Sequence, residues 1–369
     1  MTLTNSKKMK RKHIISLHGS YYSNNYGDIL LINMFYQWVK DQFPSLIINL
    51  PFVNKKQIKE MPEPSTTGII NLLRSECLVF VGGGYFGEQP KRKSLWSIRN
   101  FMRHGIVGLI AIAFRIPIAI IGVEIGPLSK KWFRWVVLKV VKSAKVVIVR
   151  NEESLAFLSE NGIRNAQLTA DAVLTLNNEV TDATNGGDNY VVMHIPGYSN
   201  YKRQIETLVR YVCEGILNSK TNIDSIIFME DLPGQYTDAY TVVFGIASSF
   251  GIPYTVKRYM GIKEVMDTIN KSTAVFTTKL HVGITAAAYN RKVFSAYSHP
   301  KTKRLHSQIG NSQNCVALSD LLNEETDIKE KIDSFLKQES FHLPFMVLKS
   351  ANNNRDALES FIRDNVFSR

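Results

Sequence analysis

A chain of 369 residues is too long for one ordinary hydrophobic core and long enough for two domains. Hydrophobic residues make up 44% of it and charged residues 21%, which is ordinary for a soluble globular protein. The three cysteines, Cys77, Cys213 and Cys315, are too scattered for a disulfide framework or a zinc site, so we expect a reducing compartment.

The formal charge is concentrated in the first half of the chain. Residues 1–178 contain 24 Lys+Arg and 11 Asp+Glu, a net charge of +13, whereas residues 179–369 contain 21 of each. A basic surface favours phosphate-bearing or membrane-surface partners. No nucleic acid is expected, because the chain has no zinc finger, no aromatic–basic RNA signature and no basic helix with heptads. The polar, basic residues 1–12 precede no apolar signal core, which argues against secretion.

Strand-like and helix-like segments alternate through this first half. Residues 106–122 are strongly apolar, but Arg115 and Pro117 interrupt them, so we expect a buried helix end followed by a central strand and no membrane span. Strands are expected at residues 13–17, 46–50, 77–81, 118–121 and 145–149, and helices at 29–40, 95–114, 131–142 and 152–160.

Residues 177–189 are polar, rich in Asn and Gly and without periodicity, so they are the expected linker between domains at 1–178 and 179–369. The alternation then restarts, and a final helix at 346–367 could cross back onto the first domain. The pattern predicts an α/β protein of two Rossmann-like, doubly wound domains that face a ligand-binding cleft. Strands are expected at 190–194, 225–229, 254–256, 274–277 and 293–297, and helices at 204–217, before Phe250, at 262–269 and from His281.

The first candidate loop runs from Gly19 to Asp28, directly after the first expected strand. Its small and amide residues, Asn25 and Gly27 among them, can present backbone N–H groups to an anion at the next helix. Asp28 lies where that helix is expected to begin. It is either the N-cap or a group that contacts an acceptor sugar or serves as a base. The loop lacks G-x-G-x-x-G spacing, so it does not support dinucleotide binding.

Glycines also follow two later strands. Gly82, Gly83 and Gly84 either form a tight turn or let a ligand approach the backbone. Glu124 follows the next strand and is a base, a sugar ligand or a solvated loop carboxylate.

Arg150 ends a hydrophobic strand and precedes a helix. A guanidinium at the carboxyl end of a strand can hold a carboxylate or phosphate with two parallel hydrogen bonds. A structural salt bridge to Glu152 or Glu153 is the alternative.

In the second half, one strand delivers Lys279 and His281 to the start of a helix. The small residues at 282–288 let that helix pack closely and leave room for a ligand. The helix dipole and Lys279 both lower the pKa expected for the imidazole, and an anionic ligand would restore its proton. Such ligand-dependent protonation suits a general acid for a phosphorylated substrate.

An ordered set of short motifs thus runs through the chain: Gly27-Asp28, Gly82-Gly83-Gly84, Gly122/Gly126-Pro127, Val149-Arg150-x-x-x-Ser154, Asp171 and Lys279-Leu280-His281. In order and spacing, from Ile14 to Ile309, this set resembles the polysaccharide pyruvyl transferase family. The resemblance implies a fold of the GT-B type, phosphoenolpyruvate as the donor substrate, no cofactor and a pyruvylated sugar as the product.

In that family an Arg-Leu-His motif and an upstream Arg contact phosphoenolpyruvate, and the His acts in catalysis. The matching residues here are Lys279, Leu280, His281 and Arg150, and Lys301 matches a lysine that follows the next strand. Lys279 departs from the family's Arg: it keeps the charge but loses the planar two-pronged grip.

The letters Arg-Leu-His recur at residues 304–306, but after an expected helix start and not after a strand, so we interpret them as a coincidence.

Adding an alcohol to C2 of an enol phosphate requires a proton at the methylene carbon and cations for the phosphate and carboxylate. His281 would donate the proton or assist phosphate departure. Arg150 and Lys279 would hold the anionic groups. Asp28 or Glu124 would accept the hydroxyl proton. No metal cluster is visible in the sequence, so no metal is expected.

Two other functions stay open at this point. The chain could be a nucleotide-sugar-dependent glycosyltransferase or a non-catalytic scaffold for glycan assembly.

The expected acceptor is a sugar or a lipid-linked oligosaccharide. The helix at 130–142 is basic and contains Trp132, Phe133 and Trp135, a composition suited to a bilayer interface. The segment at 95–114 could serve the same way. The alternative is a helix that packs its apolar stripe on the sheet with its cations in water. We therefore expect a cytoplasmic protein that is peripheral at the inner face of the plasma membrane.

Overall fold

The computed structural model describes residues 13–21, 25–53, 65–88, 93–179, 188–219, 221–322 and 325–368. These residues fold into two compact units. Unit 1 takes in the described residues among 1–23, 31–169 and 353–369, and unit 2 those among 24–30 and 170–352.

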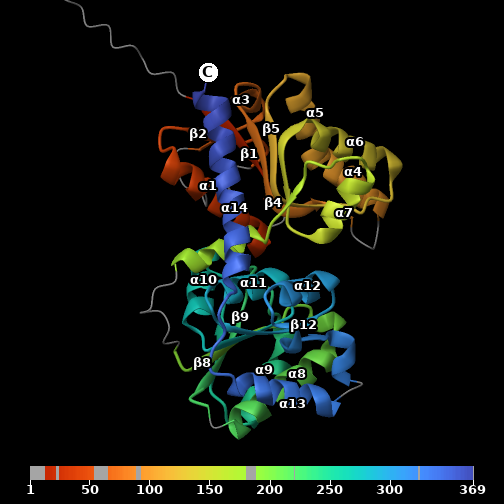
Figure 1. The fold of residues 1–369 in the computed structure, drawn as a ribbon. Coiled ribbons are helices and arrows are strands. Elements are labelled where there is room, and N and C mark those ends of the chain that lie inside the picture. The colour runs from red at the N-terminus through yellow and green to blue at the C-terminus, as the bar shows by residue number, and fades with distance from the viewer. Residues whose placement is uncertain are drawn as a thin grey trace, which may run out of the picture. The chain divides into compact units, whose positions relative to one another are not determined.

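Unit 1 contains a parallel sheet with the strand order β3-β2-β1-β4-β5-β6-β7. The order reverses direction between β1 and β4, so right-handed crossovers place the helices on opposite faces. α1 covers one face together with the end of α14, and α4, α5, α6 and α7 cover the other (Figure 1). The strands are β1 Ile14–His18, β2 Ile47–Leu50, β3 Ser65–Thr67, β4 Leu78–Phe86, β5 Ile118–Ile125, β6 Ala144–Val149 and β7 Gln167–Leu168. The helices are α1 Tyr26–Gln42, α3 Ile69–Leu73, α4 Lys93–Asn100, the π-helical turn η1 Phe101–Gly105, α5 Ile106–Ala113, α6 Lys131–Ser143 and α7 Glu152–Glu160.

The two central strands of unit 1 are longer than the sequence predicts. Ending them at the first glycine is wrong, because the parallel pairing continues through Gly83↔Val123 to Phe86↔Ile125, with an irregularity between. Gly82 lies within the strand, and its missing side chain lets α1 pack closely on the sheet. A Cβ at this position would lie 2.8 Å from Leu31 Cδ2. Glycine therefore serves helix–sheet contact here and does not end the strand.

The apolar stretch at 106–122 is α5 followed by β5, as predicted. Among the helices in the described ranges, none combines the length and apolarity that crossing a bilayer requires.

Unit 2 contains a second parallel sheet, with the order β10-β9-β8-β11-β12-β13. Its direction reverses between β8 and β11. The strands are β8 Tyr190–His194, β9 Ser225–Met229, β10 Tyr254–Lys257, β11 Ala274–Thr277, β12 Lys292–Tyr297 and β13 Cys315–Ala317. The helices are α8 Lys202–Asn218, α9 Thr241–Ser249, α10 Ile262–Lys271, α11 Leu280–Ala288, α12 Pro300–Gln308, α13 Glu325–Lys337 and α14 Phe345–Ile362, which continues as the π-helical turn η8 Arg363–Phe367. The 3₁₀ segments are η2 Ala172–Glu179, η4 Tyr198–Asn200, η5 Asp238–Tyr240, η6 Ser312–Asn314 and η7 Leu318–Leu322.

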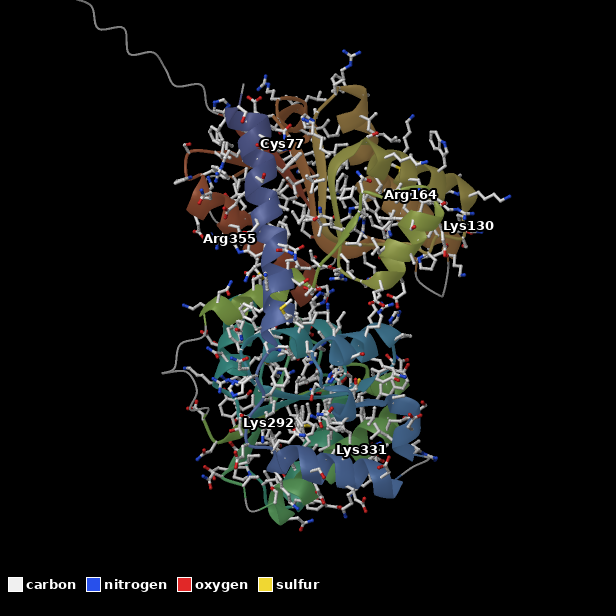
Figure 2. The ribbon with its side chains drawn as sticks, viewed as in Figure 1. Cys77, Lys130, Arg164, Lys292, Lys331 and Arg355 are labelled. Atoms are coloured by element: carbon white, nitrogen blue, oxygen red, sulfur yellow. The ribbon has the colours of Figure 1, made fainter. Side chains whose placement is uncertain are left out.

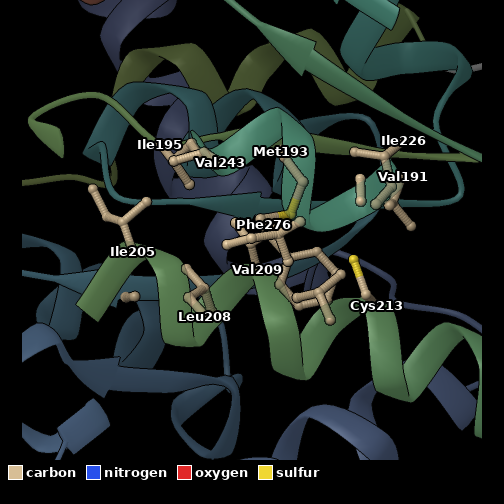
Figure 3. Close-up of a cluster of buried hydrophobic side chains, with 14 of the residues drawn as sticks. Val191, Met193, Ile195, Ile205, Leu208, Val209, Cys213, Ile226, Val243 and Phe276 are labelled. Carbon is tan, nitrogen blue, oxygen red and sulfur yellow. The ribbon is translucent and has the colours of Figure 1, made fainter. Parts of the chain in front are cut away.

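The core of unit 2 lies between the sheet and α8, α9 and α13 (Figures 1 and 3). Met193 and Phe276 point from the strands toward Val209 and Cys213 of α8 (Figure 3). All four side chains are fully buried. At about 1.5–3 kcal/mol for each large apolar side chain, this layer is a main source of the unit's stability.

The division between the units differs from the predicted boundary between residues 178 and 179. Residues 170–179 belong to unit 2, since η2 packs on α11 and Asn177 Nδ2 donates to Ala288 O at 2.9 Å. Most of the predicted linker, residues 180–187, lies outside the described residues. α14 begins in unit 2, but its residues from Asn353 belong to unit 1, where Asn354 Oδ1 accepts from Thr169 Oγ1 at 3.2 Å.

Candidate functional site

The carboxyl edge of the unit 2 sheet brings together polar side chains from three strands. His194 is the last residue of β8 and Thr277 the last of β11, and the two are direct neighbours in the sheet. Asp231 follows β9 after one intervening residue. Open α/β sheets bind ligands at the carboxyl ends of their strands where the strand order reverses, which is the position between β8 and β11.

Asp231 is the centre of this cluster. Its carboxylate is buried, and both of its oxygens accept from Lys279, whose Nζ lies 2.9 Å from Oδ1 and 2.7 Å from Oδ2. His194 Nε2 lies 3.1 Å from Asp231 Oδ1, and Nδ1 of the same ring lies 3.0 Å from Thr277 Oγ1. Burial alone would raise the pKa of Asp231, but His194 and Lys279 outweigh it and hold that pKa well below the usual carboxyl value. The cluster is therefore a charged group in a largely dry setting.

His281 occupies the first turn of α11, two residues after Lys279, which precedes the helix in extended conformation. A Cβ added to Gly27 would lie 2.0 Å from His281 Cγ and 2.1 Å from its Nδ1, so the imidazole rests directly against the Gly27 backbone. Any side chain at position 27 would displace the ring. The Gly-Asp motif thus has a physical reason: its glycine makes room for the histidine of the Lys-Leu-His motif.

A hydroxyl chain fixes the same first turn of α1 to α11. Tyr26 is fully buried, and its hydroxyl lies 3.1 Å from Thr285 Oγ1, which donates to His281 O at 2.8 Å. Burial raises the pKa of Tyr26 well above its ordinary value, so the phenol stays neutral. These contacts explain why residues 25–30 belong to unit 2 although most of α1 belongs to unit 1.

Asp28 is not the N-cap that the sequence suggested as one alternative. The helix begins earlier, because Ile29 N donates to Asn25 O at 3.0 Å, which makes Asn25 the capping residue. Asp28 lies inside the first turn, where Asn25 Nδ2 donates to its Oδ2 at 3.1 Å. Of the two carboxylates predicted as a base, Asp28 is the one next to Gly27, against which His281 packs.

In unit 1, Arg150 and Glu124 form an ion pair, with Nη2 3.4 Å from Oε2. Both side chains are buried, at 7% and 10% exposure. Glu124 lies within β5, so the alternative of a solvated loop carboxylate is wrong. Arg150 follows β6, as predicted. Two predicted site residues thus contact each other.

The remaining predicted residues lie in ordered surroundings. Gly83 has a positive φ of 138°, whereas Gly82 and Gly84 continue β4. Leu280 is the first residue of α11, and Lys301 lies in the first turn of α12, where its N–H donates to His299 Nδ1 at 3.4 Å.

Two further sequence features have structural roles. Asp171 is buried, and its Oδ1 accepts from Val173 N at 3.0 Å. His306 of the second Arg-Leu-His lies inside α12 and is buried, with Nε2 2.8 Å from Ser295 Oγ. His306 is thus part of the packing of α12 on β12.

Sequence reasoning missed His194 and Asp231. Both follow the signal that found Arg150, a titratable side chain at or just after the end of an apolar strand. In the described ranges, no set of three or more His, Cys, Asp or Glu side chains is arranged to hold a metal ion.

Comparisons with known proteins identify the wider group. A family model described as polysaccharide pyruvyl transferase matches residues 25–300. A comparison with curated protein sequences found no match. The solved UDP-GlcNAc 2-epimerase from Methanocaldococcus jannaschii is 13% identical, with a TM-score of 0.58 over 95% of this chain and 100% of that one. The enzyme from Neisseria meningitidis, solved bound to UDP-GlcNAc, is 9% identical, with a TM-score of 0.58 over 97% and 100%. These likenesses show the fold alone, and they confirm the GT-B-like class.

Proposed function

Because this chain belongs to the polysaccharide pyruvyl transferase family, we propose that it moves the pyruvyl group of phosphoenolpyruvate onto sugar hydroxyls of a surface polysaccharide or its lipid-linked precursor. One observation supports the assignment most directly. The family's histidine, His281, lies in the first turn of α11, beside Lys279 and seated on the glycine of another family motif. The reaction would take place in the cytoplasm.

The chemistry divides among a few groups. A sugar oxygen attacks C2 of phosphoenolpyruvate, the methylene carbon takes up a proton, and phosphate leaves. Attack by a second hydroxyl then closes a ketal. His281 at a helix N-terminus serves as the proton donor or assists the departing phosphate. Lys279 supplies positive charge for the donor's phosphate or carboxylate, and Arg150 is the second donor ligand that the family resemblance assigns.

Asp231 and His194 position Lys279 in this proposal. The ammonium is held by two carboxylate contacts, so its charge is fixed in place before the donor arrives. Preorganised charge costs no rearrangement at the moment of reaction, which is why such fixed groups are effective in catalysis. Asp28 is the better candidate than Glu124 for accepting the hydroxyl proton, since Glu124 is buried against Arg150.

The experiment follows phosphate release and product mass with phosphoenolpyruvate and a panel of free and lipid-linked sugars. We expect His281→Ala to lose turnover by about 100-fold or more while it stays folded. His342→Gln, at an exposed position, is the matched control and should keep full activity. Unchanged turnover in His281→Ala would overturn the assignment. Thermal stabilisation by nucleotide sugars, with none by phosphoenolpyruvate, would favour a glycosyltransferase instead.

Gly27→Ala tests the geometry without changing any polar group. Its Cβ would occupy the space of the imidazole ring, so the ring must move. We expect kcat to fall while phosphoenolpyruvate still stabilises the protein through Lys279. Alanine favours a helix interior by up to about 1 kcal/mol over glycine, so loss of folding is not the expected outcome. Normal kcat in this variant would contradict a catalytic role for the observed ring position.

A further inference from the structure

Unit 1 exposes two apolar stripes that its core does not use. Leu95, Ile98 and Met102 are 61%, 54% and 56% exposed. They recur at intervals of three and four residues along α4 and η1, which places them on one helix face. Trp132 and Trp135 of α6 are 44% and 59% exposed. Large apolar side chains that are gathered together on a surface indicate an interaction site more than isolated ones do.

The two stripes belong to adjoining elements on the same face of the sheet (Figure 1). Phe101 of η1 and Trp132 of α6 meet edge to face, with ring centroids 5.6 Å apart. Further along, Gly108 lets α5 approach α6 closely, because an added Cβ would lie 2.5 Å from Val140 Cγ2. The opposite side of α6 is anchored in the core by buried residues such as Phe133. The helix is therefore fixed, and its two tryptophans face outward.

The sequence that carries these stripes is rich in cations and poor in acids. Between Lys93 and Asn151 the sequence has 11 Lys+Arg and one carboxylate residue, Glu124, which is buried against Arg150. The adjacent Glu88 side chain is 6% exposed and lies 3.8 Å from Lys93 Nζ. The cations on or directly before α4, η1 and α6 are Lys93, Arg99, Arg103, Lys130 (Figure 2), Lys131, Arg134, Lys139 and Lys142.

Two of these cations already stack on aromatic rings. Arg99 lies 4.4 Å from the centre of the Trp96 ring, and Lys139 Nζ lies 4.9 Å from that of Trp135. Amphipathic rings with a cation beside them are the composition found at the headgroup level of a bilayer, where the ring body is apolar and the charge meets phosphate.

We propose that this surface, formed by Leu95, Ile98, Met102, Trp132 and Trp135, binds an anionic lipid bilayer. The apolar side chains enter the headgroup region, and the surrounding lysines and arginines contact lipid phosphates. The occupant is a bilayer rather than a protein because the charge is of one sign across two helices and their connections, which complements a uniformly anionic surface. This inference deepens the proposed function by naming how the protein reaches a lipid-linked acceptor, but its test does not require that function.

The test is sedimentation of the full chain with vesicles of phosphatidylcholine alone or mixed with an equal part of phosphatidylglycerol. We expect binding to the mixed vesicles that weakens with added salt. The pair Trp132→Ser with Trp135→Ser should lower partitioning by about tenfold or more. Lys131→Glu with Lys139→Glu should remove the preference for phosphatidylglycerol. The matched control is Met260→Ser with Phe345→Ser, two residues of unit 2 that are 81% and 73% exposed, and it should bind as the parent does.

Equal partitioning of the parent and the double-tryptophan variant would overturn the proposal. So would light scattering that shows a parent dimer dissolved by the same substitutions, because the surface would then be a protein interface. Phosphate release with a free sugar, measured without vesicles, separates the two proposals. If release persists while vesicle binding fails, only this surface assignment is wrong, and the reverse result contradicts the proposed reaction alone.

Discussion

A histidine ends the first strand of each sheet, and the two histidines have opposite surroundings. His18 ends β1 beside the point where the unit 1 sheet reverses direction, and His194 ends β8 at the equivalent point of unit 2. His18 Nε2 lies 2.9 Å from His104 Nδ1, and His18 Nδ1 lies 3.0 Å from the Tyr21 hydroxyl. Its partners are thus neutral rings. His194 instead faces the Asp231–Lys279 ion pair.

Burial has different consequences at these two positions. It lowers the pKa of His18 to about 3 and, together with the nearby His18, Arg103 and Arg99, that of His104 well below its ordinary value. At Asp231 the contacts with His194 and Lys279 outweigh burial and keep the carboxylate ionised. The fold supplies the same position twice, and its side chains surround one histidine with rings and place the other beside an ion pair. In the proposed reaction, unit 2 therefore contributes Lys279 to the anionic donor, and Arg150 of unit 1 is the second ligand.

The largest expected effect is that of Asp231→Asn, which keeps the shape and removes the charge. Breaking a buried ion pair usually costs about 3–5 kcal/mol. We expect about 2–4 kcal/mol here, because Lys279 is 31% exposed and its ammonium can turn toward water. Hydrogen exchange of peptides that cover β8 and β11 measures this loss in unit 2, and turnover should fall with it.

The rest of the molecule supplies the control. All four tryptophans, at positions 38, 96, 132 and 135, belong to unit 1, so their emission reports that unit alone. Their unfolding transition should not move in Asp231→Asn. Asp238→Asn, at an exposed position, should change stability by less than about 0.5 kcal/mol. Unchanged exchange in unit 2 of Asp231→Asn would show that the ion pair does not hold the edge together.

His104→Gln is the matching change in unit 1, and its effect should be smaller. Replacing one partner of a buried neutral hydrogen bond costs about 1–3 kcal/mol.

The same histidine pair makes the stability of unit 1 depend on pH. A histidine whose folded pKa is lowered stabilises the protein above its unfolded pKa of 6.5, and this contribution is lost as pH falls from 6.5 toward 3. Stability of unit 1 should therefore decline below pH 6.5.

Removing one of the two imidazoles should reduce that decline by up to about 1.4 kcal/mol per pH unit. Denaturant titrations followed by tryptophan emission between pH 7 and pH 4.5 measure it. Asp231→Asn should leave this slope unchanged, since its carboxyl titrates below the range and lies in the other unit. A slope that His104→Gln does not alter would mean that the pair is not buried as observed.

The strand pattern was the most predictable part of the fold. Strands 225–229 and 274–277 match β9 and β11 residue for residue, because a buried parallel strand is a short, continuous apolar run with clear ends. For the glycine-containing strands β4 and β5, the sequence predicts ends that are four or five residues too early. A glycine is a turn signal in isolation, and only the helix packed against Gly82 reveals why it lies within a strand.

The site was predictable only where its residues are close in sequence. Lys279 and His281 share one segment, so their proximity followed from the helix start. Their contacts with Asp231 and Gly27 join segments that are far apart along the chain: the strand order brings Asp231 near Lys279, and the packing of the start of α1 on α11 brings Gly27 to His281. A sequence pattern fixes the end of each strand but not which strands are neighbours, so the charged cluster could not be foreseen.

The smallest expected effect is that of Lys279→Arg, which restores the residue typical of the family. Asp231 presents both oxygens to Lys279, at 2.9 and 2.7 Å, and a planar guanidinium fits two oxygens at least as well as an ammonium does. Stability of unit 2 should therefore change by no more than about 0.5 kcal/mol. A guanidinium also has donors left over for the substrate, so KM for phosphoenolpyruvate should fall several-fold at nearly constant kcat. Steady-state kinetics of Lys279→Arg and Lys279→Met measure this difference. Lys279→Met should lose both the ion pair and donor binding. A rise in KM for Lys279→Arg would mean that the charged edge is built around an ammonium, and that the donor is held differently in this chain than in proteins that carry the arginine.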